Sequence, residues 1–562
     1  MRKKRLASLL AAAGLLASTV PLFTAAQASA LSAGTPLSAD SVLLSSDSLL
    51  SANTAQADAV QADTAQADAA YLRQKPAWHR CAADLPATYE CASIKVPLDY
   101  RRPRGRTLDL AISRVRSTNP AKRHGVLLMN PGGPGGSGLD LPLALGEAVP
   151  AEVGERFDLI GFDPRGVGAS SPISCGLADA ERGIDRPYRP GSFPSDVAWA
   201  RTIAEKCREK AGSVLPYITT RNTARDMDTI RAVLGERKLS YLGYSYGTYL
   251  GAVYTQMFPG RTDRFVLDSG VDPDLIWRGM FQVWATEAEP AFARWTRWAA
   301  QRSGEYHLGE SPAAVSKTLW DLVARADRDP IVFQGEKISG DDIRRARALF
   351  FYPAEVTPLV VALKEAAEGK PAAVPGASGP DFDMKRALAG RSGAPAEPAS
   401  DNDVAVFWSV VCGDTDSWPS DPERYRRDAV RDKAAYPLYG DFASNIKPCA
   451  FWPRPLEAQT PMKARAGVLT VQNEWDSQTP LASGQGLHRA LKGSRMVLAQ
   501  GAEGHGVYLA DPSSCANAPV TAYLTTGRLP AEDITCRAPS PGADKQGAPA
   551  KPLPIPSGPG RF

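Results

Sequence analysis

Ser245 lies between two glycines in the sequence Gly243-Tyr244-Ser245-Tyr246-Gly247. The residues before it, 239–243, form a strand-like apolar run. Residues 248–258 have a helix-like pattern, and Pro259-Gly260 would end that helix. A sharp turn from a strand into a helix exposes a serine hydroxyl, and the flanking glycines let the backbone pass without a Cβ clash. The pattern predicts a nucleophilic serine, with an ordinary glycine-rich turn as the alternative.

A serine hydroxyl needs a base to take its proton before it can attack a carbonyl carbon. The chain has five histidines, and His505 lies in a glycine-rich segment directly after a strand-like run. Asp476 follows another such run and would hold the imidazole ring and stabilise its charged form. Serine, acid, histidine is one of the known chain orders of a catalytic triad. We therefore predict a Ser245–Asp476–His505 triad, with Glu474 as the alternative acid and a turn or helix-capping role as the alternative for Asp476.

Acyl transfer also needs N–H donors for the oxyanion of the tetrahedral intermediate. The backbone N–H of Tyr246, directly after the serine, is the expected first donor. The second should come from the early glycine-rich loop Asn130-Pro131-Gly132-Gly133-Pro134-Gly135-Gly136, in which we favour Gly133 over Gly132. Phosphate binding by this loop is disfavoured, because no Gly-Lys-Ser or Gly-Lys-Thr follows it.

The elements that would carry these residues alternate between strands and helices. Short apolar runs bounded by turn residues predict strands, and stretches between them, such as 223–234, predict helices. This alternation favours an α/β fold with a mostly parallel central sheet and helices on both faces. The strand candidates are 108–113, 125–129, 157–162, 239–243, 264–267, 467–471 and 495–498.

The alternation breaks in the middle of the chain. We predict a core in two parts, 78–273 and 454–538, with a mainly helical cap inserted at 274–453. A stretch rich in proline, glycine and alanine at 371–398 predicts a loop within this cap. The final residues, 539–562, form a tail rich in proline and glycine.

The N-terminus predicts export. A basic patch, a short apolar run and the small residues Ala28-Ser29-Ala30 are typical of a signal peptide over 1–30, with a retained anchor as the alternative. Residues 31–70 contain no aromatic or basic side chain, which predicts a disordered leader or pro-segment, or else a spacer that stays attached. We expect a secreted, extracellular protein with no membrane contact after signal removal.

The cysteine count agrees with an exported chain. Eight cysteines form an even set, which favours disulfides over a metal site, because no Cys-x-x-Cys occurs. The sequence alone does not fix their pairing, and we expect sequential pairs that close short loops. We expect no metal and no cofactor. The formal net charge is only +4, which gives no electrostatic argument for nucleic-acid binding.

Taken together, these motifs resemble the secreted actinobacterial tripeptidyl aminopeptidases, which belong with the prolyl-iminopeptidase-like α/β-hydrolases. Besides the Ser245, Asp476 and His505 segments, the resemblance rests on 130–136, on Phe162-Asp163-Pro164-Arg165-Gly166-Val167-Gly168 and on Asp268-Ser269-Gly270-Val271-Asp272-Pro273, and it spans 81–536. It implies the α/β-hydrolase fold and removal of short peptides, tripeptides above all, from free N-termini. Asn130-Pro131 stands where prolyl iminopeptidases have His-Gly, which argues against strict proline specificity.

An exopeptidase must close its cleft and pair the substrate ammonium with carboxylates. Asp414 and Asp416 are the candidate acids, although the segment that contains them could equally be a structural loop. Two other functions stay open: a secreted lipase or esterase with the same triad, and a non-enzymatic binding protein on a degenerate hydrolase fold. The triad residues alone do not separate ester from amide hydrolysis.

Overall fold

The computed structural model describes residues 70–373 and 401–538, all within one compact unit that begins at residue 63. The predicted signal peptide and tail lie outside the described residues, as does the predicted leader except for its last residue. The same holds for the predicted loop at 371–398 except for its first three residues. None of the helices described is long and apolar enough to cross a membrane.

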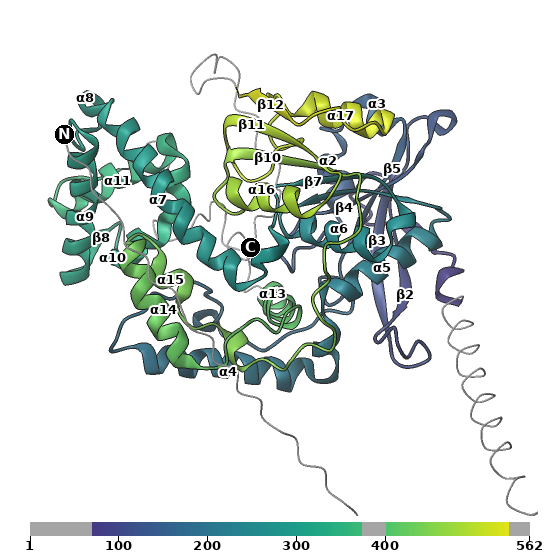
Figure 1. Cartoon of the computed structure of the whole chain (residues 1–562), viewed down its shortest axis with the longest axis horizontal. Coiled ribbons are helices and arrows are strands. Elements are labelled where there is room, and N and C mark those ends of the chain that lie inside the picture. The colour runs from purple at the N-terminus through teal and green to yellow at the C-terminus, as the bar shows by residue number, and fades with distance from the viewer. Residues whose placement is uncertain (1–69, 374–400, 539–562) are drawn as a thin grey trace, which may run out of the picture. The chain divides into compact units, whose positions relative to one another are not determined.

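A ten-stranded sheet forms the centre of the structure, in the order β1-β2-β3-β5-β4-β6-β7-β10-β11-β12 (Figure 1). The first three strands pair antiparallel, and β3 also pairs antiparallel with β5. Every pairing from β5 to β12 is parallel. The strands are β1 (His79–Arg80), β2 (Tyr89–Pro97), β3 (Thr107–Val115), β4 (Gly125–Asn130), β5 (Phe157–Phe162), β6 (Leu239–Tyr244), β7 (Thr262–Asp268), β10 (Leu469–Trp475), β11 (Arg495–Glu503) and β12 (Ile534–Arg537).

The sheet is buried on both faces, as a parallel sheet must be. In β4, Val126 and Leu128 belong to one buried cluster, whereas Leu127 and Met129 belong to another. Residues of α5 and α6 complete the first cluster, and residues of α2 and α17 complete the second. The predicted α/β-hydrolase architecture is therefore confirmed. The helices outside the insertion are α2 (Leu141–Gly146), α3 (Ala151–Gly154), α4 (Phe193–Ala211), α5 (Thr220–Val233), α6 (Tyr246–Met257), α16 (Leu481–Ala490) and α17 (Asn517–Thr526), with 3₁₀ turns η1 (Pro120–Lys122), η2 (Asp179–Glu181), η3 (Gly212–Tyr217), η4 (Pro259–Arg261) and η5 (Pro273–Leu275).

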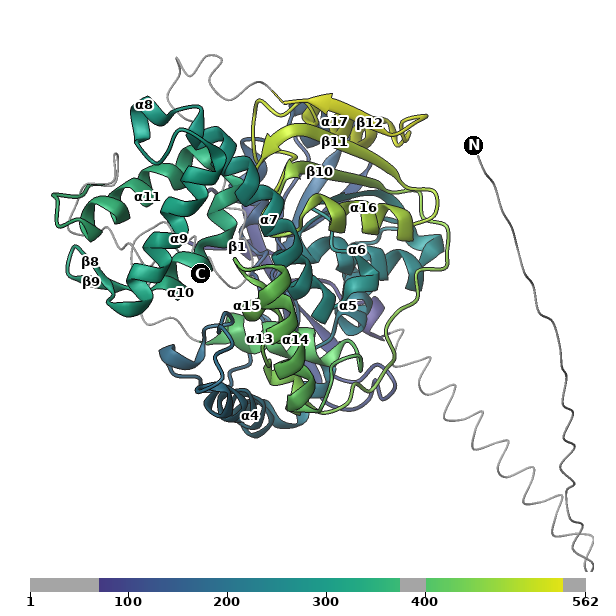
Figure 2. The same cartoon turned by 60° about the vertical axis from the view of Figure 1, so that its left-hand side comes forward.

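An inserted helical region, residues 278–451, separates β7 from β10 along the chain. In both views its helices α8 to α11 stand apart from the sheet, and the long helix α7 leads to them (Figures 1 and 2). These helices bury a cluster of their own around Phe292, Trp295 and Phe350. The elements are α7 (Arg278–Ala300), α8 (Ser303–Tyr306), α9 (Pro312–Arg328), β8 (Ile331–Phe333), β9 (Glu336–Ile338), α10 (Gly340–Arg345), η6 (Ala346–Phe351), α11 (Pro353–Ala367), α13 (Asn402–Gly413), α14 (Pro422–Ala435), α15 (Gly440–Ser444) and η7 (Pro448–Phe451).

Some elements differ from the sequence prediction. The strands β1, β2 and β12 were not among the candidates, and the inserted helical region contains the small hairpin β8–β9. Gln334 and Gly335 link the two hairpin strands, with φ of 48° and 86°. Two consecutive residues with positive φ are typical of a tight hairpin turn. The sequence analysis missed this hairpin because strands of three residues are too short to show the alternation of apolar and polar residues that predicts a strand.

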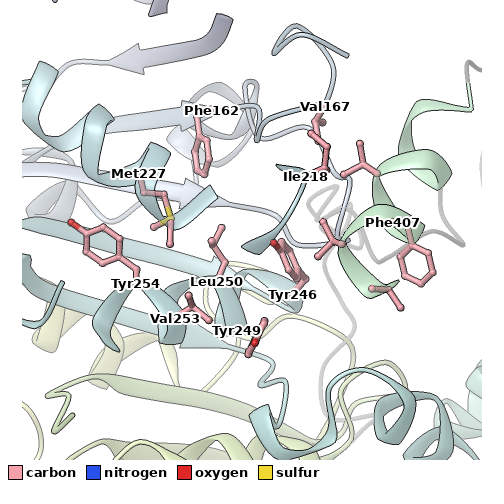
Figure 3. Close-up of a cluster of buried hydrophobic side chains, with 14 of the residues drawn as sticks. Phe162, Val167, Ile218, Met227, Tyr246, Tyr249, Leu250, Val253, Tyr254 and Phe407 are labelled. Carbon is pink, nitrogen blue, oxygen red and sulfur yellow. The ribbon is translucent and has the colours of Figure 1, made fainter. Parts of the chain in front are cut away.

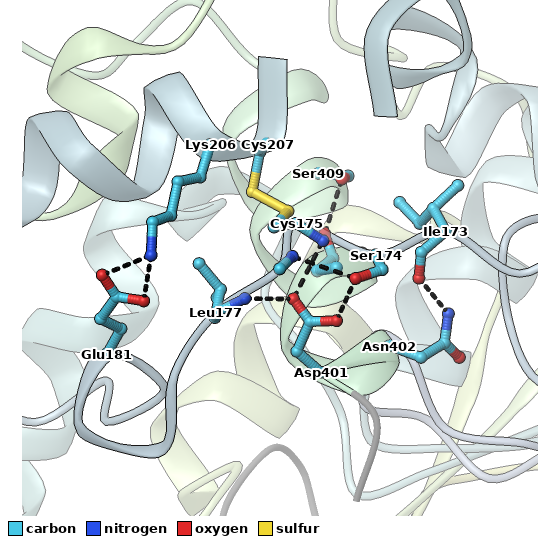
Figure 4. The surroundings of a disulfide bond; sticks show 12 residues. Ile173, Ser174, Cys175, Leu177, Glu181, Lys206, Cys207, Asp401, Asn402 and Ser409 are labelled. Carbon is cyan, nitrogen blue, oxygen red and sulfur yellow. Dashed lines mark hydrogen bonds and ion pairs between the residues drawn. A yellow bond between two sulfur atoms is a disulfide. The ribbon is translucent and has the colours of Figure 1, made fainter. Parts of the chain in front are cut away.

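Sequential disulfide pairing is confirmed. The bonds are Cys81–Cys91, Cys175–Cys207, Cys412–Cys449 and Cys515–Cys536. Beside Cys175, the Asp401 carboxylate accepts hydrogen bonds from the backbone N–H groups of Cys175 and Leu177 and from the Ser174 hydroxyl (Figure 4). The start of α13 is thereby tied to the segment that follows β5.

Candidate active site

Ser245 occupies the turn between β6 and α6. Its φ is 56° and its ψ is −124°, a conformation that residues other than glycine rarely adopt. A Cβ on Gly243 would lie 2.6 Å from the Gly247 carbonyl oxygen, and one on Gly247 would lie 2.8 Å from Asn130 Oδ1. Close contacts thus leave no room for a Cβ on either side of the serine. We call this turn between β6 and α6 the serine elbow. It packs against the core, because Tyr246, Tyr249 and Leu250 belong to the buried cluster drawn in Figure 3.

Asp476 and His505 meet beyond the ends of β10 and β11. His505 Nδ1 lies 2.9 Å from Asp476 Oδ2 and 3.0 Å from Oδ1. The Asp476 side chain is fully buried, and its carboxylate also accepts hydrogen bonds from the backbone of Gln478 and from the backbone and hydroxyl of Thr479. The other ring nitrogen, His505 Nε2, is buried and has no hydrogen-bond partner among the described residues. The structure therefore contains no hydrogen bond between Nε2 and Ser245 Oγ, and Nε2 keeps its capacity to accept one.

The alternative acid, Glu474, is engaged elsewhere. Its carboxylate accepts a hydrogen bond from the Gly501 backbone at 2.6 Å. A neighbouring side chain shapes the histidine loop instead: Asn473 Nδ2 donates to the carbonyl oxygens of Gly504 and Gly506, on either side of His505. The geometry therefore favours Asp476 over Glu474 as the partner of the imidazole.

Asp268, at the end of β7, joins the serine elbow to the histidine loop. Its backbone carbonyl accepts a hydrogen bond from the Ser245 N–H at 2.9 Å. Its buried carboxylate accepts from the backbone N–H groups of Val507 at 3.0 Å and Tyr508 at 2.7 Å. The next residue, Ser269, accepts from the Gly506 N–H at 2.9 Å. Two segments far apart in sequence thus share one anchor.

The environment of Asp268 is itself unusual. Burial raises the pKa of its carboxyl to about 7, and the hydrogen bonds from Tyr508, Ser269 and Val507 limit that rise. A carboxylate that accepts hydrogen bonds from several backbone N–H groups fixes the path of the main chain as well as its own position. The sequence analysis assigned no role to Asp268. The available signal was its place directly after the predicted strand 264–267, within a motif of the family resemblance.

The loop after β4 lies against the serine elbow. A Cβ on Gly132 would lie 2.6 Å from the Tyr244 carbonyl oxygen and 3.2 Å from the Tyr246 nitrogen. The Gly132 N–H already donates to Asn130 Oδ1 at 3.1 Å. In the described part of the chain, the N–H groups of Gly133 and Tyr246 have no acceptor. Of the two candidate glycines, Gly133 therefore retains the unused donor.

Asp163, just after β5, holds the far end of this loop. Its Oδ1 accepts hydrogen bonds from the Ser137 hydroxyl and from the backbone of Gly138 and Leu139. Its Oδ2 accepts from the Ala169 N–H at 2.8 Å. The two glycine-rich loops that follow β4 and β5 are thereby bound to one carboxylate.

The two acids predicted to bind the substrate ammonium lie in different environments. Asp414 is buried and accepts hydrogen bonds from the Thr220 backbone at 2.8 Å and the Thr220 hydroxyl at 2.6 Å, with Trp277 Nε1 at 3.4 Å. Burial raises its pKa to about 6. The Thr220 hydroxyl also lies 2.9 Å from the Tyr246 hydroxyl, so Asp414 supports the serine elbow from behind. Asp416 is exposed on the surface.

A third acid, Glu287, lies on α7. Along this helix, Trp284 Nε1 donates to the carbonyl oxygen of Gln478, and Arg294 forms an ion pair with Glu503. These contacts direct one side of α7 to the segments that carry Asp476 and His505. Glu287 lies between them on the same side at helical spacing. Its carboxyl is half-buried, burial raises its pKa, and it has no ion-pair partner in the described ranges.

No cluster of histidine, cysteine and acidic side chains suited to a metal ion is found in residues 70–373 and 401–538. The groups that the structure brings into contact at this site are the Asp476 carboxylate and the His505 imidazole.

Two family models and several named proteins match this chain. Residues 125–320 match a family model described as alpha/beta hydrolase fold, and residues 436–536 match one described as TAP-like protein. The tripeptidyl aminopeptidase of Streptomyces lividans is 38% identical over 480 residues, which covers 82% of this chain and 86% of that protein. The serine protease Hip1 of Mycobacterium tuberculosis is 31% identical over 499 residues, or 83% of this chain and 91% of its own length.

A third relative carries a different name. Carboxylesterase B of Mycobacterium tuberculosis is 31% identical over 488 residues, which covers 82% of this chain and 89% of that protein. Identity at this level over most of both chains is evidence of common descent. The chain belongs to the tripeptidyl-aminopeptidase-like family of α/β-hydrolases.

Proposed function

We propose that this protein is a serine aminopeptidase that releases short peptides, tripeptides above all, from free N-termini. The observation that carries the proposal is the buried Asp476–His505 pair, whose free Nε2 belongs to the loop that Asp268 ties to the Ser245 elbow. The tripeptidyl aminopeptidase relatives support the same substrate class.

In the proposed reaction, Ser245 Oγ attacks the scissile carbonyl carbon while His505 Nε2 takes its proton. Asp476 holds the Nδ1–H tautomer and stabilises the imidazolium. The N–H groups of Tyr246 and Gly133 donate to the oxyanion. The imidazolium then protonates the leaving amine, and a water molecule activated by the same imidazole hydrolyses the acyl-enzyme.

Selection of a free N-terminus requires a negative charge at the end of the cleft. We propose Glu287 for this role, in place of Asp414 and Asp416. The Asp414 carboxylate is occupied by Thr220 and Trp277, and Asp416 faces solvent, whereas Glu287 has no ion-pair partner in the described ranges. A half-buried carboxylate without a cation is suited to binding an ammonium group.

Peptides of matched sequence with free and acetylated N-termini test the exopeptidase assignment. We expect release of a tripeptide from the free form and no cleavage of the acetylated form, with products identified by mass spectrometry. Equal cleavage of both forms would refute the selection of N-termini and leave an endopeptidase.

The Carboxylesterase B relative motivates a second candidate function, hydrolysis of carboxylic esters by the same triad. A series of p-nitrophenyl esters measured beside the peptides separates the two. Efficient turnover of medium-chain esters without any peptide cleavage would favour the esterase.

We also propose that the protein is secreted and acts on extracellular peptides. Four disulfides and the absence of free cysteines among the described residues support an oxidising compartment. Recovery of the mature protein from culture medium tests this, and retention in the cytosol would contradict it.

A further inference from the structure

Arg347, in η6 of the inserted helical region, is a buried cation without an acid of its own. Only 5% of its surface is exposed, and no carboxylate in the described ranges forms an ion pair with it. Its guanidinium lies over the ring of Trp284 at 4.5 Å and over the ring of Tyr439 at 4.7 Å. Buried arginines are normally paired, so this environment requires a reason.

A hydrogen bond of the guanidinium explains why it is buried at this place. Arg347 donates to the carbonyl oxygen of Ser477 at 2.9 Å, and Ser477 directly follows Asp476. Two aromatic rings hold the planar guanidinium in place from the sides, which favours a single donor direction. The inserted helical region therefore places a rigid, charged hydrogen-bond donor one residue from the proposed catalytic acid.

Two more contacts from the same region hold this segment. The Tyr352 hydroxyl lies 2.9 Å from Ser477 Oγ, and Trp284 Nε1 donates to the Gln478 carbonyl oxygen at 2.6 Å. The inner side of the same turn is held by Asp476 itself, which accepts from the backbone of Gln478 and Thr479. The turn is therefore fixed from two sides, and one of these sides belongs to the insertion.

We propose that Arg347 is a positioning residue for catalysis, and that docking of the inserted helical region aligns Asp476 with His505. This proposal rests on the proposed triad. If the insertion shifts, the turn that follows Asp476 loses its hydrogen bonds to the insertion, and the Asp476–His505 hydrogen bond lengthens. Catalysis at Ser245 would then depend on the state of the insertion, even for substrates too small to reach it.

Arg347→Met tests the proposal, with Arg345→Met as the matched control. Arg345 lies two residues away, and among the described residues its one ion pair is with Asp342, within the insertion. In the full-length protein we expect the kcat for p-nitrophenyl acetate to fall about tenfold in Arg347→Met, because small misplacement of catalytic groups is costly. KM should change little. Arg345→Met should retain the wild-type kcat.

A spectroscopic readout separates positioning from general loss of structure. The Nδ1–H proton of a histidine bonded to a carboxylate resonates far downfield, and we expect this signal to broaden or disappear in Arg347→Met and to persist in Arg345→Met. Arg347→Lys, which keeps a donor, should recover part of the lost kcat. Wild-type kcat and an intact downfield signal in Arg347→Met would overturn the proposal.

Should Arg347→Met fail to fold, Trp284→Phe carries the test, because it removes the indole donor to Gln478 and keeps an aromatic ring beside Arg347. A severalfold lower kcat for the ester is expected, and an unchanged kcat in folded Trp284→Phe would overturn the proposal. Ester hydrolysis that survives in Ser245→Ala would contradict the proposed function itself. A wild-type rate in Arg347→Met of a Ser245-dependent enzyme would contradict only the positioning role.

Discussion

The loops at the carboxyl ends of the strands and the inserted helical region both contain carboxylates that accept from backbone N–H groups, but the insertion adds ion pairs and aromatic contacts between side chains. In the loops, Asp163, Asp268 and Asp476 each collect backbone N–H groups from neighbouring segments. In the insertion, ion pairs such as Arg344–Asp441 join side chains, and aromatic rings such as Phe292 and Phe350 pack at 5.3 Å between centroids. Bonds to the backbone fix the main chain in one path, whereas contacts between side chains tolerate more change. We therefore expect changes in the loops to alter the rate of the chemical step most strongly, and changes at Glu287 in the insertion to alter substrate selection.

The largest effect is expected from Asp268→Asn in the loop region. One of the two carboxylate oxygens would become an NH2 group, which cannot accept from the N–H groups of Val507 and Tyr508, and His505 would move with its loop. We expect kcat to fall about 100-fold, because a displacement of about 1 Å at a catalytic group costs this much. Initial rates with a chromogenic tripeptide anilide measure it.

Asp342→Asn is the matched control from the insertion. Asp342 accepts hydrogen bonds from the backbone and hydroxyl of Ser339 and pairs with Arg345. Its loss should lower the melting temperature and leave kcat close to that of the wild type. A similar loss of kcat in both variants would erase the contrast between the two regions.

A smaller and more selective effect is expected from Glu287→Gln. Loss of the carboxylate should raise KM for peptides with a free N-terminus about tenfold, since a hydrogen bond to a charged group contributes about 1.5–3 kcal/mol. KM for a neutral ester should not change. Glu289→Gln is the control, because Glu289 accepts from the Leu438 backbone and lies on another side of α7.

Glu287 also predicts a pH dependence. Burial raises the pKa of its carboxyl, so the group takes up a proton at a higher pH than an exposed glutamate does. The protonated form carries no charge for the substrate ammonium. KM for free peptides should therefore rise as the pH falls in wild-type protein and stay flat in Glu287→Gln. Parallel pH profiles would exclude the ammonium contact.

The smallest effect on activity is expected from Asp414→Asn. The amide oxygen still accepts from the Thr220 backbone, and the amide nitrogen can donate to the Thr220 hydroxyl, so kcat/KM should stay within about threefold of wild type. A tenfold higher KM would return Asp414 to the ammonium-binding role that its sequence context predicted.

Stability offers a second readout for the same variant. Burial raises the Asp414 pKa from 3.8 to about 6, so the folded protein binds a proton there more tightly than the unfolded chain does. The stability that this tighter proton binding adds to the folded protein is fully present below pH 3.8 and is lost as the pH rises through about 6. Denaturant unfolding across this window should show a flatter profile in Asp414→Asn.

The residues of the proposed triad could be chosen from the sequence because their signals are local. Ser245 follows a strand and lies between glycines that the turn requires. Asp476 and His505 each follow a strand whose carboxyl end meets the same edge of the sheet. Their contact at 2.9 Å agrees with a prediction that needed only chain order and strand positions.

The supporting residues could not be predicted in this way. Asp268 acts on a loop about 240 residues later, and Arg347 acts through Ser477 across two separate elements. Which side of α7 faces the turn after Asp476 depends on how the insertion docks, so no local pattern favours Glu287 over Asp414. Such roles follow from tertiary packing, which a pattern in one segment does not contain.

The central claim is that Ser245 is a nucleophile activated by His505, and reaction with a fluorophosphonate at neutral pH tests it most directly. The account predicts one phosphonate per chain, located on Ser245 by peptide mass spectrometry, with none in Ser245→Ala and a strongly slowed reaction in His505→Ala. Labelling of a different residue, or an equal labelling rate in His505→Ala, would contradict it.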